Sequence, residues 1–146
     1  MRAIKVLASA VAGALVSGLV LGALSRLFMR LMTLAADGEP RFSWTGTFFI
    51  AVIYVAAVAP AALTAAITTR WWRWIAAALG TAFLMAPAIG ISSEEIGYVQ
   101  GLSTIAWIGV GAATAAVFAT VFAAPAAAIW LVDRVRIPMP VRLSPA

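Results

Sequence analysis

The sequence predicts an all-α integral membrane protein, a single domain over residues 1–146 built as a four-helix transmembrane bundle. Two observations lead to this prediction. Hydrophobic residues make up 64% of the chain and charged residues only 10%, whereas a soluble domain carries about 25% charged residues. The apolar residues also gather in four runs, each long enough for a helix that crosses a bilayer, which needs roughly 17–25 residues. Charged residues lie at the ends of these runs or between them.

The first span is predicted over residues 4–34. Residues 25–36 contain nothing that breaks a helix, and the stop signal Asp-Gly-Glu-Pro at 37–40 comes only after them. A helix of this length is expected to tilt or to protrude from the bilayer. We expect an uncleaved anchor rather than a signal peptide, because the apolar stretch before the Ala-Ser-Ala at 8–10 is unusually short.

The remaining spans are predicted over residues 47–69, 75–91 and 102–132, and each contains one proline. Arginine and tryptophan residues at 70–74 predict an interfacial turn between the second and third spans, because both residue types favour the headgroup level. After the third span, Ser92 with Glu95 three residues later matches a capping box. This pattern predicts that a new helical turn begins there, within a loop.

The distribution of basic residues predicts how the chain is oriented. With four spans, both termini and the second loop share one side, which holds seven of the ten basic residues: Arg2, Lys5, Arg70, Arg73, Arg134, Arg136 and Arg142. The other side holds Arg26, Arg30 and Arg41, with four of the five acidic residues. The positive-inside rule therefore predicts a cell-membrane protein with both termini in the cytoplasm.

One face of the first span is polar. At about 100° per residue, one sector of this helix holds two glycines and most of its polar residues, namely Gly18, Gly22, Ser25, Arg26, Arg30, Thr33 and Asp37. Gly18 and Gly22 form a GxxxG spacing, which allows another helix to approach closely. In the fourth span, Gly109 and Gly111 are further candidates for helix packing.

The arginines of this face need acceptors, because an unpaired charge inside a membrane is costly. Glu94 and Glu95 are the expected acceptors, since they fall on the same side of the membrane and carboxylates pair well with guanidinium groups. The predicted cluster of Arg26, Arg30, Glu94 and Glu95 is extended by Asp37, and Tyr54 of the second span is placed to reach it.

Three interpretations of the arginines stay open. In the first, the arginines extend to the outer headgroups or form a structural salt bridge. In the second, they line an outward-facing vestibule that attracts an anion. In the third, a partner subunit supplies the missing acid.

Two short motifs flank the first loop. The first span ends in Arg-x-x-Met-Arg at residues 26–30, and Phe-Ser-x-x-Gly-Thr at 42–47 leads into the second span. Over this first third, the chain resembles small, poorly characterised actinobacterial multi-pass membrane proteins. The resemblance implies a multi-pass membrane protein and no particular activity.

Composition also limits the function. The chain has no Cys and no His, which removes thiolate chemistry, the commonest metal ligand and the usual general base near neutral pH. We therefore expect no catalytic residue, no metal and no cofactor. We also expect no nucleic-acid partner, because the basic residues form no continuous face. The chain is then predicted to be a structural or accessory membrane subunit, and the alternative is a small transporter or channel for an anion. Expected partners are the lipid bilayer and either further copies of the chain or a larger membrane complex.

Overall fold

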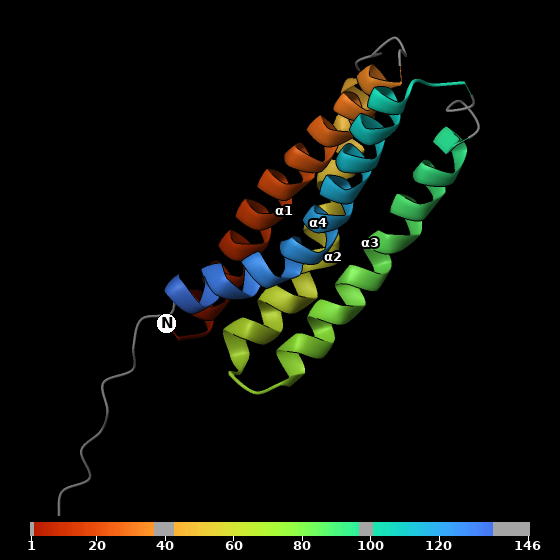
Figure 1. Ribbon diagram of the computed structural model, residues 1–146. Helices are drawn as coiled ribbons and strands as arrows, with labels where there is room; N and C mark the ends of the chain where they lie inside the picture. The colour runs from red at the N-terminus through yellow and green to blue at the C-terminus, as the bar shows by residue number, and fades with distance from the viewer. Residues whose placement is uncertain (1, 37–42, 97–100, 136–146) are drawn as a thin grey trace, which may run out of the picture.

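The chain folds into four α-helices that run alternately in opposite directions (Figure 1). The computed structural model describes residues 2–36, 43–96 and 101–135, and of residues 2–3 and 91–96 only the backbone. The helices are α1 (Arg2–Ala35), α2 (Trp44–Ile67), α3 (Trp72–Ile96) and α4 (Thr104–Val135), and these described ranges contain no strand. All four helices are long and apolar enough to cross a membrane. The all-α prediction with four apolar helices is confirmed.

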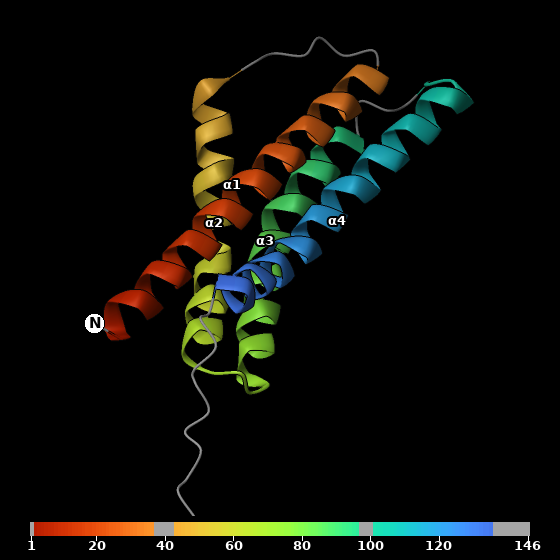
Figure 2. The same cartoon turned by 90° about the vertical axis from the view of Figure 1, so that its left-hand side faces the viewer.

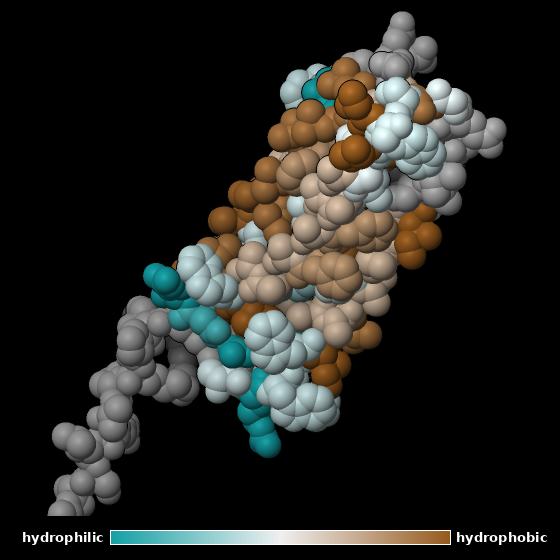
Figure 3. All heavy atoms as spheres, viewed as in Figure 1, coloured by the Kyte–Doolittle hydropathy of each residue, from teal (hydrophilic) through white to brown (hydrophobic). Residues whose placement is uncertain are grey.

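The bundle has two ends, which we call the terminal end and the distal end. The terminal end holds the start of α1, the end of α4 and the link at 68–71 between α2 and α3 (Figures 1 and 2). The distal end holds the end of α1, the end of α3 and the starts of α2 and α4. On the face that Figure 3 shows, the described hydrophilic residues gather mainly at the terminal end, and a band of apolar residues extends from there toward the distal end.

Serine caps begin two of the helices. Ser43 Oγ accepts a hydrogen bond from the backbone N–H of Gly46 at 3.1 Å, and Ser103 Oγ accepts one from Ala106 at 3.3 Å. The first N–H groups of a helix have no partner within it, so each cap satisfies one of them. Gly101, in the turn before α4, has φ +100°, a conformation that glycine adopts without strain.

The third helix is longer than the sequence predicts. The capping-box interpretation of Ser92 and Glu95 is wrong, because α3 continues without a break to Ile96 and contains Glu94 and Glu95 in its last turn. Pro87 lies inside α3 and does not end it. A proline removes one backbone donor, and membrane-type helices tolerate that loss.

The interior of the bundle is built from small side chains. α1 packs against α2 and α4, and α3 packs against the same two helices, while the backbones of α1 and α3 stay farther apart in the described ranges. The most deeply buried positions are mainly alanines and valines: Val58, Ala61, Ala62, Ala65, Val121, Ala124, Ala128 and Val132. Small residues let helix backbones approach closely and pack over a large area.

Three glycines lie where two helices approach most closely. A Cβ on Gly18 would lie 2.7 Å from Cα of Val55, and a Cβ on Gly22 would lie 3.4 Å from Cα of Ala51. On α3, a Cβ on Gly80 would overlap the carbonyl oxygen of Ala57. The α1–α2 contact at Gly18 and the α2–α3 contact at Gly80 therefore depend on glycine having no side chain.

The two glycines of α4 differ in their surroundings. A Cβ on Gly109 would lie 3.1 Å from Cβ of Ala35, at the contact with α1. Gly111 is exposed, and a Cβ there would have no described neighbour within 4 Å. Gly111 therefore does not pack against another helix within the described part of the chain, and its role in helix packing stays a prediction. Positions two residues apart on a helix point in nearly opposite directions, so both cannot face α1.

Candidate functional site

Arg26 and Arg30 lie one turn apart in the distal half of α1, and both side chains are half-buried. The guanidinium of Arg26 lies over the first turn of α2, where a Cβ on Gly46 would be 3.6 Å from its Nη2. Its Nε is buried and has no hydrogen-bond partner among the described residues. A positive group therefore meets the positive end of the α2 dipole. An anionic group beside Arg26 would stabilise this arrangement.

The acidic residues predicted to pair with these arginines are only partly described. Asp37 lies outside the described residues. The backbone of Glu94 and Glu95 belongs to the end of α3, at the same end of the bundle as Arg26 (Figure 1), and their side chains lie outside the described part. The ion-pair cluster therefore stays a prediction.

Tyr54 does not belong to the arginine cluster, contrary to the prediction. It is 4% exposed, and its hydroxyl oxygen lies 2.9 Å from Oγ1 of Thr120 on α4. Thr120 donates its own proton to the carbonyl oxygen of Val117 at 2.7 Å. The proton between the two hydroxyls must therefore come from Tyr54. Tyr54 lies on the buried face of α2, and its hydroxyl meets α4.

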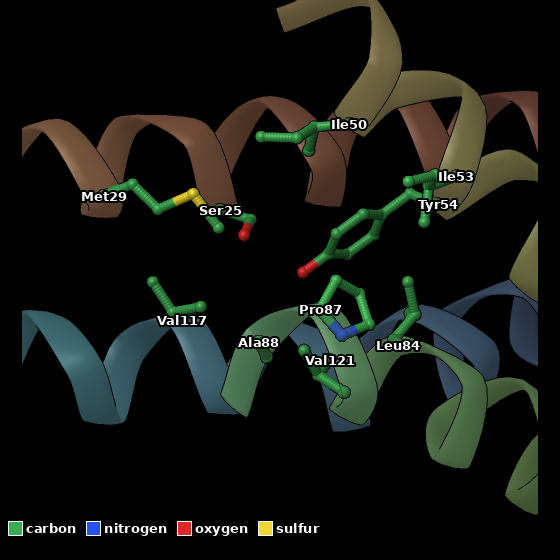
Figure 4. Close-up of a pocket in the computed structure, with 10 residues that line it drawn as sticks. All are labelled: Ser25, Met29, Ile50, Ile53, Tyr54, Leu84, Pro87, Ala88, Val117 and Val121. Atoms are coloured by element: carbon green, nitrogen blue, oxygen red, sulfur yellow. The ribbon is translucent and has the colours of Figure 1, made fainter. Parts of the chain in front are cut away.

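A small cavity lies beside this hydrogen bond, with room of about 30 Å³ for the centre of a water molecule. Residues from all four helices line it (Figure 4): Ser25, Met29, Ile50, Ile53, Tyr54, Leu84, Pro87, Ala88, Val117 and Val121. The lining is apolar except for the hydroxyls of Ser25 and Tyr54, and both hydroxyls point into the cavity (Figure 4). The sequence places Ser25 on the polar face of the first span but gives no sign that Tyr54 would meet it.

Ser25 differs from the other buried serines of α1. Ser9 Oγ donates to the carbonyl oxygen of Val6 at 2.9 Å, and Ser17 Oγ donates to that of Gly13 at 2.7 Å. Such bonds to the preceding turn are the usual arrangement for serine within a helix. Ser25 is 0% exposed, and its Oγ has no hydrogen-bond partner in the described part of the chain.

An ion pair that the sequence analysis missed joins α3 to α4 at the terminal end. Nη1 of Arg73 donates to both carboxylate oxygens of Asp133, at 3.0 and 2.7 Å. The two side chains are 18% and 38% exposed. One signal was present in the sequence, since Asp133 is the one acidic residue that the span order assigns to the arginine-rich side. The span order alone does not say which arginine it meets.

Exposed tryptophans and arginines surround this ion pair. The rings of Trp71 and Trp72 stack with centroids 4.8 Å apart, and the guanidinium of Arg134 lies 4.7 Å from the ring centroid of Trp130. Tryptophan and arginine together favour the boundary between lipid headgroups and hydrocarbon. This end of the bundle therefore has the composition of a membrane interface.

Fold and site together define a bundle of four apolar helices with one small hydroxyl-lined cavity and a half-buried arginine pair. The described residues contain no group of three or more His, Cys, Asp or Glu side chains that could hold a metal ion. No family model, no curated protein and no solved structure matches this chain.

Proposed function

We propose that this chain is a multi-pass integral membrane protein of the cell membrane that serves as a structural or accessory subunit. Four helices of sufficient length and apolar character support the membrane location. Lys5, Arg70, Arg73 and Arg134 lie toward the terminal end, which supports a cytoplasmic position for that end and for both termini. The resemblance to small actinobacterial multi-pass proteins agrees with this proposal.

The filled interior of the bundle is the observation that favours a subunit role. The α2 positions Val58, Ala61, Ala62 and Ala65 are fully buried against neighbouring helices, and the cavity at Ser25 has room of only about 30 Å³. A solute path through one chain would need a continuous polar opening between the helices. Large apolar side chains on the outer faces of all four helices remain exposed and are available to lipid or to a partner helix.

Reconstitution tests this function directly. The protein is purified in a mild detergent, its mass and co-purifying chains are measured, and chloride and phosphate flux is followed in liposomes. A subunit is expected to give a discrete assembly larger than one chain and no flux above empty liposomes. Anion flux that depends on the protein would overturn the subunit proposal.

Arg26 favours a second candidate, a small transporter or channel for an anion. Its buried Nε has no partner in the described ranges and its guanidinium lies over the start of α2, an arrangement that an anion would stabilise.

If the protein is an anion transporter or channel, Arg26→Leu and Arg30→Leu abolish flux while insertion and assembly persist. Under the subunit role, the same changes lower the yield or dissociate the assembly, and charge swaps with Glu94 or Glu95 restore it. Arg70→Leu, at the other end, is the matched control.

The orientation has its own test. A reporter that is active only in the periplasm is fused after Arg142. If the C-terminus lies in the cytoplasm, as the positive-inside rule predicts, the reporter is inactive. An active reporter would place the C-terminus outside. A second fusion, inserted between residues 37 and 42, is expected to be active.

A further inference from the structure

We propose that the cavity between Ser25 and Tyr54 binds one water molecule, which connects α1 to the Tyr54–Thr120 hydrogen bond. The site goes beyond the proposed subunit role, because it concerns how the bundle is held together in its centre. It rests on the geometry of two hydroxyls, the size of the cavity and the direction of the neighbouring hydrogen bonds.

Ser25 provides the first observation. Its Oγ is fully buried, points into the cavity (Figure 4) and has no hydrogen-bond partner among the described residues. A buried hydroxyl without a partner is destabilising relative to one that is satisfied. Ser9 and Ser17, on the same helix, avoid this by donating to the preceding turn. The hydroxyl of Ser25 therefore points into a space where no described side chain accepts its hydrogen bond.

Tyr54 provides the complementary group. Because Thr120 donates to Val117, Tyr54 uses its only proton in the bond to Thr120. The Tyr54 oxygen can then only accept a further hydrogen bond. No direct bond joins it to Ser25. A water molecule accepts the proton of Ser25 and donates one of its own to Tyr54, which satisfies both hydroxyls.

The cavity has a suitable size and a further acceptor. About 30 Å³ of room exceeds the ~10–15 Å³ that a single water needs. Val121 also lines the cavity, and its carbonyl oxygen lacks the usual helical donor because residue 125 is proline. This carbonyl is a candidate acceptor for the second proton of the water. A purely apolar cavity of this size would stay dry.

The sign of the Ser25→Ala effect on thermal stability tests the proposal. If a water is bound, the alanine removes one of its partners, and the melting temperature in detergent falls by about 2–4 °C. If the cavity is dry, the alanine removes an unsatisfied hydroxyl, and the melting temperature rises or stays unchanged. A rise or no change would overturn the proposal. Ser17→Ala is the matched control, since Ser17 is equally buried but bonded to its own helix.

A double variant and a structure complete the test. With Tyr54→Phe as background, the water has already lost one of its acceptors and no longer connects α1 to Tyr54, so Ser25→Ala is expected to lower the melting temperature less than in the wild type. Strict additivity would contradict the bridge. A structure at a resolution that shows ordered waters is expected to contain one within about 2.6–3.2 Å of both hydroxyl oxygens. An empty cavity with Ser25 bonded to the carbonyl of Leu21 would overturn the proposal.

Discussion

The hydroxyl oxygens of Tyr54 and Thr120 lie 2.9 Å apart in the bundle interior, although 66 residues separate them in the chain. This bond joins α2 to α4 by side-chain hydroxyls, and it borders the cavity that contains Ser25. Polar side chains are rare in these helices, so a bond between two of them selects one arrangement of α2 against α4.

Tyr54→Phe removes this bond and keeps the ring. We expect the free energy of unfolding to fall by about 0.6 kcal/mol, the average measured for hydrogen bonds between membrane helices, and by no more than about 1.7 kcal/mol, the largest value measured. Denaturant titration in mixed micelles measures it. Thr120→Ser keeps the hydroxyl and is the control, with a smaller loss expected. An unchanged stability in Tyr54→Phe would mean that the bond contributes nothing to the fold.

Gly18→Ala is expected to destabilise the contact of α1 with α2. The new Cβ would lie 2.7 Å from Cα of Val55, so a backbone has to shift. Overpacking of this kind typically costs about 1–3 kcal/mol. Gly111→Ala adds the same methyl group where no described atom lies within 4 Å, and its melting temperature should stay near that of the wild type. Equal effects of the two changes would contradict the close approach at Gly18.

Gly80→Ala tests the α2–α3 contact. Its Cβ would overlap the carbonyl oxygen of Ala57, and a backbone atom cannot move aside as a flexible side chain can. We expect α3 to separate locally from α2 and the melting temperature to fall. Gly90→Ala, on the same helix with open space at its Cβ, is the control. Because the natural chain has no Cys, an engineered cysteine pair across the α2–α3 contact can report the separation as slower cross-linking.

The ion pair between Arg73 and Asp133 is expected to contribute little to stability and to depend on salt. Asp133 is 38% exposed, and exposed pairs typically contribute about 0.2–1 kcal/mol. Arg73→Gln should lower the unfolding free energy by no more than this, and the loss should shrink as salt rises. Arg70→Gln removes a neighbouring exposed charge and is the control. Exchanging the two partners, as Arg73→Asp with Asp133→Arg, should restore most of the loss.

The fold class could be predicted because it follows from local properties. Long apolar runs must form helices in a membrane, since every backbone group needs a partner within its own segment. The sequence also identified Gly18 with Gly22 as a close-packing pair, because this pattern lies on one helix face. The end of α3 was predicted wrongly, since Ser92 and Glu95 resemble a helix start while α3 continues past Pro87 to Ile96.

The composition and the order of apolar runs in this sequence determined four helices and the face of α1 that holds Ser25 and Arg26. Only the tertiary structure decided which partners those residues meet: Tyr54 bonds Thr120 and not the arginines, and Arg73 bonds Asp133. The physical reason lies in the helices themselves. Their apolar residues run around most of the circumference, so periodicity does not fix how each helix is rotated, and contacts between distant residues depend on that rotation.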